Sequence, residues 1–175
     1  MTREDVLSRF PEGSVYYLPL LLGMELKLTK SETFGLSWQD VDLARGIVRV
    51  NNVAYYNRFD NYIYFFKSVK SNTSNLTIPA QNALKRAKKR VNYNRGTNTK
   101  QTYTVRVNGQ LRGPYEQWPR RHGNLCDELI PVCARQDGTY ISPQGINYVA
   151  RILQGKQGRF NAPDSNWKWE DLWVL

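Results

Sequence analysis

The sequence predicts an α+β domain that is mostly helical and carries a small three-stranded antiparallel sheet. The run 15–25 is almost continuously apolar and too long for an ordinary strand, which favours a buried helix. The segment 81–91 places Ala, Leu and Val on one face and Lys and Arg on the other, as an amphipathic helix does. Three short runs, 47–53, 62–66 and 76–78, are separated by polar turns, which is typical of an antiparallel meander.

Composition limits the classes of function. At 175 residues with 41% hydrophobic content, the chain is expected to form one domain, 1–175, with a buried core. A formal net charge of +10 favours an anionic partner, most often nucleic acid, although a solvated basic surface is the simpler alternative. No apolar run approaches the roughly 20 residues that span a membrane, so no membrane partner is expected.

Neither a metal nor a cofactor is expected. Cys126 and Cys133 are separated by six residues, which is no recognised zinc or redox spacing, and His122 is the only histidine. We interpret both cysteines as reduced and structural. No phosphate-binding loop, G-x-S-x-G motif or pair of histidines occurs.

Capping and turn residues predict where several elements begin and end. Thr2 and Asp5 have the spacing of a capping box at the start of a first helix. Ser31 is the predicted N-cap of a short helix that ends near Gly35, and Ser142 with Pro143 predicts the start of a late helix. Turns are predicted at 11–14, 59–61, 71–74 and 135–139.

The stretch 27–43 reads KLTKSETFGLSWQDVDL and is followed by a turn and an apolar strand. This pattern resembles the start of the catalytic domain of tyrosine recombinases, the phage-type integrases. The resemblance implies a mainly helical domain with its sheet at one edge. In that family a Gly-Leu-Arg tripeptide precedes the helix, and its arginine binds the scissile phosphate. The arginine position falls on Thr29 in this sequence.

Two lysines resemble the family's catalytic lysine, which protonates the leaving 5′ oxygen. Counting back from the segment 77–79, Thr-Ile-Pro, Lys70 matches its position on the hairpin. Lys67 lies three residues earlier and stays an alternative, and an ordinary solvent-facing lysine is the simpler interpretation of either.

The segment 137–144 resembles the stretch before the second catalytic cluster in integrases of Gram-positive mobile elements. With Leu172 as the anchor of the register, Glu170 falls on the family's histidine and Trp173 on its second arginine. None of the eleven tyrosines has a context that matches the nucleophile. We therefore expect the N-terminal DNA-clamping domains and the C-terminal tyrosine segment to be absent.

These features predict a cytoplasmic, bacterial or phage-derived integrase-like domain that binds double-stranded DNA and is related to DNA integration and recombination, without catalytic activity. The basic loop or insertion 92–124 is expected to contribute to DNA binding. The predicted DNA-binding residues are Lys27, Lys30, Lys67, Lys70, Lys85, Arg86, Lys88, Lys89 and Arg90. One alternative is a fragment of an active recombinase completed by another chain. Another alternative is a protein-interaction module, in which the end 167–173 binds a partner or a second copy of the chain. The simpler interpretation of this end is a hydrophobic plug that covers the core.

Overall fold

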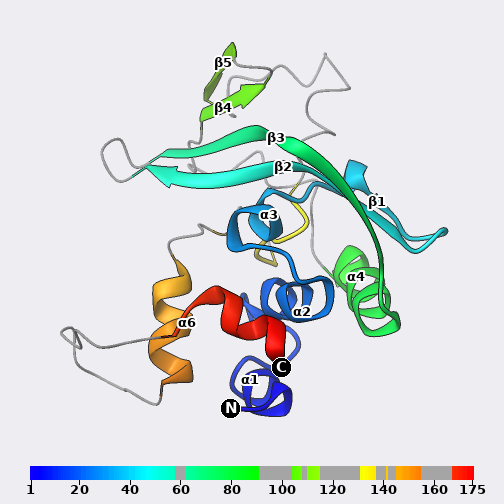
Figure 1. Ribbon diagram of the computed structural model, residues 1–175, viewed down its shortest axis with the longest axis vertical. Helices are drawn as coiled ribbons and strands as arrows, with labels where there is room; N and C mark the ends of the chain where they lie inside the picture. Colours follow the sequence, from blue (N-terminus) through cyan, green and yellow to red (C-terminus); the bar gives the residue numbers. More distant parts are fainter. Residues whose placement is uncertain are drawn as a thin grey trace.

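The computed structural model describes residues 1–57, 62–90, 104–107, 110–114, 131–136, 141, 145–154 and 167–175. Figure 1 shows a sheet along one edge of a group of helices. The helices are α1 (Arg3–Arg9), α2 (Tyr17–Leu26), α3 (Lys30–Gly35), α4 (Ile78–Arg90) and α6 (Ile146–Leu153), with 3-10 turns η1 (Trp38–Asp40) and η5 (Trp169–Val174). The strands are β1 (Val41–Asp42), β2 (Ile47–Asn57), β3 (Tyr62–Asn75), β4 (Thr104–Val107) and β5 (Gln110–Pro114).

The sheet has the predicted number of strands but not the predicted strands. Its order is β1-β2-β3, antiparallel throughout, and the third strand is β1 rather than the predicted 76–78. Residue Ile78 instead begins α4, because the hydroxyl of Thr77 accepts a hydrogen bond from the Ala80 amide at 3.3 Å and Pro79 fits the first helical turn. The strand prediction rested on β-branched residues that cap and begin a helix.

The predicted turn at 71–74 is also wrong, since β3 runs without a break from Tyr62 to Asn75. The β2–β3 ladder carries a register shift instead, between the pairs Val50↔Asn72 and Asn52↔Lys67. The predicted turn at 59–61 lies outside the described residues, as do 137–139 of the predicted turn at 135–139. The strands β4 and β5 lie within the predicted basic loop or insertion 92–124 and pair antiparallel.

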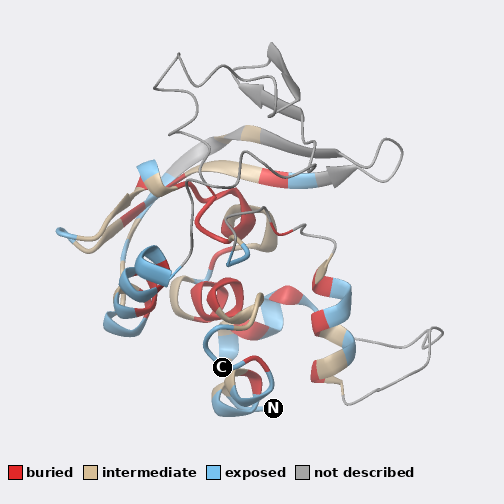
Figure 2. Cartoon of the chain, turned by 180° about the vertical axis from the view of Figure 1, so that it is seen from behind, coloured by how far each residue is buried: buried red, intermediate tan, exposed pale blue. Residues whose placement is uncertain are grey.

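The core is built around α2, which is apolar on every side and packs against α3, α4 and η5. Leu20 and Leu22 are fully buried, and Phe34 of α3 and Val48 of β2 complete the centre. Figure 2 shows buried residues concentrated on α2 and α3 and exposed residues along the outer side of α4. The predicted buried helix over 15–25 is therefore confirmed, with bounds Tyr17–Leu26.

Contacts of nearby side chains and carbonyls determine the ends of α1 and α6. The predicted capping box of Thr2 and Asp5 is present at α1. The helix α6 begins at Ile146 with Gly145 at its N-cap position, later than predicted, and the predicted cap residues 142–143 lie outside the described residues. At its other end, the Arg9 guanidinium donates to the carbonyls of Ile152 and Leu153 at 2.7 and 2.8 Å, a position where a cation suits the helix dipole.

Gly35 and Gly23 permit close approaches between elements of the core. A Cβ at Gly35 would lie 2.5 Å from the Asn52 carbonyl oxygen and 2.6 Å from the Val53 Cα, both backbone atoms of β2. A Cβ at Gly23 would lie 2.7 Å from Cζ2 of Trp169. Glycine is therefore required where α3 meets the sheet and where α2 meets η5.

Gly35→Ala and Gly23→Ala should both destabilise the fold, although alanine within a helix normally gains about 1 kcal/mol over glycine. The loss should reach about 1–3 kcal/mol and be larger for Gly35→Ala, because its new methyl group meets backbone that cannot change rotamer. Urea denaturation followed by circular dichroism measures both. An unchanged or increased free energy of unfolding for Gly35→Ala would contradict the close approach of α3 and β2.

Candidate functional site

The first predicted site position, Thr29, is the N-cap of α3. Its hydroxyl accepts from the Glu32 amide at 3.3 Å and lies 2.8 Å from the Glu32 carboxylate, which also accepts from the Thr29 amide at 2.7 Å. This arrangement is a capping box, so the predicted N-cap Ser31 is wrong by two residues. The hydroxyl of Thr29, which the sequence alignment predicts at the family's arginine position, is therefore engaged in capping the start of α3.

The residue before the family's leucine adopts a backbone conformation that favours glycine. Lys27 has φ 55° and ψ 32°, and within the described residues it is the one non-glycine residue with a positive φ. In the Gly-Leu-Arg alignment this position is the glycine, and Leu28 is the leucine. Lys27 thus makes a left-handed turn before α3, at the position that the predicted alignment gives to the glycine.

The end of the described chain docks on that same turn. The indole Nε1 atoms of Trp169 and Trp173 both donate to the Leu28 carbonyl, at 2.8 and 3.1 Å. The Lys27 ammonium donates to the Trp173 carbonyl. The structure therefore brings the position of Thr29 and the segment of Glu170 and Trp173 together, across more than 140 residues of sequence.

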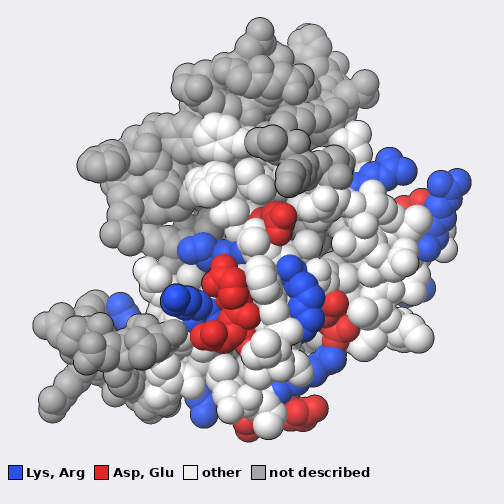
Figure 3. Space-filling view, in the orientation of Figure 1, with Lys and Arg blue, Asp and Glu red and all other residues white. Residues whose placement is uncertain are grey.

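The charge around this junction is mixed rather than uniformly basic. Glu170 and Asp171 are exposed on η5 and follow the exposed Lys168. Figure 3 shows Asp and Glu side chains gathered over η5, with Lys and Arg side chains on either side. Lys30 is half-buried at the first position of α3. Two lysines, Lys27 and Lys30, thus flank Thr29, but neither provides the planar, two-pronged donor of an arginine.

The backbone places Lys70 in an irregular part of the sheet. Residues 68–71 of β3 lie between the pairs Asn52↔Lys67 and Val50↔Asn72, opposite the single residue Asn51 of β2. Such bulges redirect side chains and are frequent beside active sites. The side chains of Lys67 and Lys70 lie outside the described part of the structure, so their role stays a prediction.

Asp40 supports β2, the strand opposite this bulge. Its carboxylate is buried and accepts from the Ser37 hydroxyl at 2.9 Å and from the amides of Asn51 and Asn52 at 2.6 and 3.3 Å. Three neutral donors thus satisfy a buried charge. The side chain fixes the position of β2 where Lys70 lies across from it.

The basic face of α4 is less available to bind DNA than its composition suggests. Of the five predicted residues, Arg86 and Arg90 contact Glu12 at 2.6 and 3.4 Å, and Lys88 lies 5.3 Å from the centre of the Trp38 ring. The hydrogen bond to Glu12 raises the pKa of the Arg86 guanidinium further above its usual value. Lys85 and Lys89 are exposed, one helical turn apart, and neither pairs with an acidic side chain among the described residues.

Within the described residues, no group of three or more His, Cys, Asp or Glu side chains could hold a metal ion. The helices described are all too short or too polar to cross a bilayer. Cys133 is buried, and its burial raises the pKa of the thiol. Its Sγ atom lies 3.6 Å from the Thr33 carbonyl, so it packs behind α3 rather than facing the junction.

No protein-family model and no curated protein matches the sequence. Solved structures do match. The Tn1549 transposon integrase in complex with a circular intermediate DNA superimposes with a TM-score of 0.59 and 15% identity, covering 98% of this chain and 49% of that one. The same integrase with transposon right end DNA gives 0.55 and 14%, covering 97% and 48%. The chain spans about half of those chains, and the predicted tyrosine-recombinase-like fold is confirmed.

Thr29→Val should lower the free energy of unfolding by about 1 kcal/mol, because it removes the capping hydroxyl and keeps the shape of the side chain. Thr29→Ser, which keeps the hydroxyl, is the matched control and should stay close to the wild type. Urea denaturation of the three proteins measures the difference. Equal stability of the Val and Ser variants would contradict a capping role for Thr29.

Proposed function

We propose that this domain binds duplex DNA in a setting of DNA integration or site-specific recombination, and that it carries out no strand cleavage itself. Three observations support the DNA partner. Two solved structures that share the fold are of the Tn1549 transposon integrase in complex with DNA. The chain carries a formal net charge of +10. Lys85 and Lys89 form an exposed cationic stripe on α4, the kind of surface that contacts phosphates without reading sequence.

The state of Thr29 is the observation that carries the proposal of inactivity. Attack on a phosphodiester builds negative charge on the phosphorane, and in this family two arginines hold that charge. Thr29 has no charge, and its hydroxyl is engaged with Glu32. Loss of one such donor can cost about a hundred-fold or more in rate.

The second half of the site supports the same conclusion. The indole N–H of Trp173 is bonded to the Leu28 carbonyl, so it donates nothing to a substrate. Glu170 is exposed and repels phosphate when it is ionised. Neither residue supplies the cationic donor that the aligned family positions provide.

The contacts of the end 167–173 agree with the plug interpretation. Trp169 is 5% exposed, Leu172 is fully buried, and Trp167 and Trp173 pack partly buried against the core. The alternative, a protein partner or self-association at this end, stays a prediction.

Binding to a duplex of arbitrary sequence should weaken linearly in log Kd against log salt concentration, because phosphate contacts release counter-ions. Replacing both stripe residues, Lys85→Gln and Lys89→Gln, should flatten that slope by about 0.9 for each phosphate that the variant no longer neutralises. Lys168→Gln, which removes the same charge beside the acidic residues of η5, should change it little. Fluorescence anisotropy at several salt concentrations measures these slopes, and no binding even at low salt would refute the DNA proposal.

A nicked suicide substrate that traps covalent intermediates should give no protein–DNA adduct, because the charge-stabilising donors are lacking. Denaturing electrophoresis of the protein after incubation with labelled DNA detects an adduct directly. Any adduct would favour the competing interpretation, a recombinase fragment completed by another chain.

A further inference from the structure

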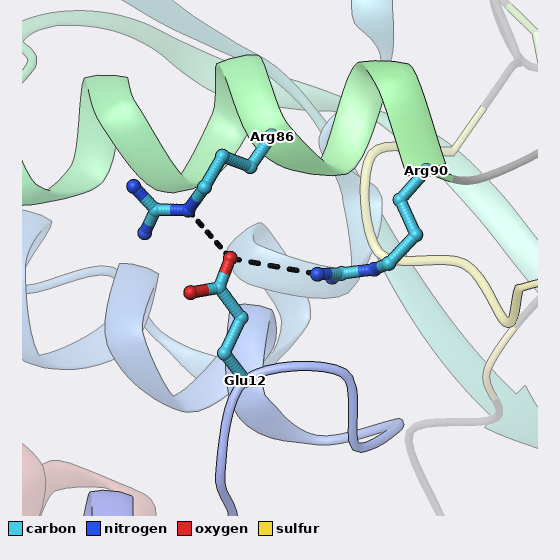
Figure 4. Close-up of polar contacts among 3 residues, drawn as sticks. All are labelled: Glu12, Arg86 and Arg90. Carbon is cyan, nitrogen blue, oxygen red and sulfur yellow. Dashed lines mark hydrogen bonds and ion pairs between the residues drawn. The ribbon is translucent and has the colours of Figure 1, made fainter.

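Glu12 contacts two of the predicted DNA-binding residues, Arg86 and Arg90. It lies in the turn between α1 and α2, 74 residues before Arg86 and 78 before Arg90. Figure 4 shows both guanidinium groups converging on one carboxylate oxygen, Oε1, from successive turns of α4. Two cations thus share a single anionic oxygen, and the group of three keeps one net positive charge.

The group lies at the surface and is accessible to a competitor. The side chains of Arg86, Arg90 and Glu12 are 50%, 33% and 35% exposed. Ion pairs at such exposure contribute little to folding stability and are screened by salt. An anion that offers more oxygens than Glu12 can therefore replace its carboxylate without disturbing the fold.

Two guanidinium groups one helical turn apart form a fork that binds carboxylate and phosphate oxygens alike. Each arginine directly follows a residue of the exposed cationic stripe, since Lys85 precedes Arg86 and Lys89 precedes Arg90. Arg86 and Arg90 therefore border the stripe on α4 along which a duplex would lay its phosphates. In the free protein, the Glu12 carboxylate would thus occupy the position that a backbone phosphate takes in the complex.

We infer that Arg86 and Arg90 form a latent phosphate site for duplex DNA, which Glu12 occupies in the free protein and which the DNA backbone takes over on binding. This inference rests on the proposed DNA-binding function. It assigns Glu12 as an internal competitor that lowers the affinity for DNA.

Glu12→Gln in the full chain should bind duplex DNA about three- to ten-fold more tightly at about 50 mM salt, with a slope in log salt steeper by about 0.9. Glu4→Gln is the matched control, since it removes the same charge from an exposed position of α1 that no arginine contacts among the described residues. The gain should vanish when Arg86→Gln and Arg90→Gln are added. Anisotropy titrations measure affinity, and thermal unfolding verifies that each variant is folded.

The outcomes separate the two proposals. DNA binding by the wild type with no gain, or a loss, in Glu12→Gln overturns the inference and leaves the proposed function standing. An equal gain in Glu4→Gln also overturns it, because net charge alone would then explain the effect. A gain in affinity that persists when Arg86 and Arg90 are replaced overturns the inference as well. The absence of binding by any of these proteins at low salt refutes the proposed function itself.

Discussion

The carbonyl of Leu28 is the point on which the rest of the structure depends, because it accepts hydrogen bonds from two indoles of η5. Buried indole N–H groups need an acceptor, and a carbonyl has two lone pairs to offer. Trp169 reaches it because Gly23 leaves room beside α2, and its ring then lies 6.0 Å from that of Phe34. One backbone oxygen thereby joins the end of the described chain to the turn before α3.

The same junction is held together by polar contacts in which no arginine takes part. The left-handed turn at Lys27, the capping box of Thr29 and the indole bonds satisfy one another's polar groups. None of these contacts requires an arginine. A scaffold that is stable by its core and by such local bonds can lose the residues of a site and keep its architecture, which is why fold and function are separate arguments.

Local patterns were the predictable part of this structure. The capping box at Thr2 needs only residues three apart, and the buried helix follows from a continuous apolar run. Thr29 and Glu32 have the same Thr-x-x-acid spacing, which also identifies a capping box, so the true N-cap of α3 is visible in the sequence two residues before Ser31. The pairing of Glu12 with Arg86 spans 74 residues, and no periodicity in the sequence indicates it.

Net charge therefore overstates how much of the surface is available to a polyanion. Three of the five basic residues predicted on α4 are engaged, two by Glu12 and one by the Trp38 ring. Lys85 and Lys89 make up the stripe and pair with no acidic side chain among the described residues, whereas Glu170 and Asp171 are exposed on η5 beside the turn before α3. The proposed binding without cleavage is consistent with this arrangement, because a duplex needs only cations at its backbone, whereas a phosphorane needs arginines positioned at the reacting phosphate.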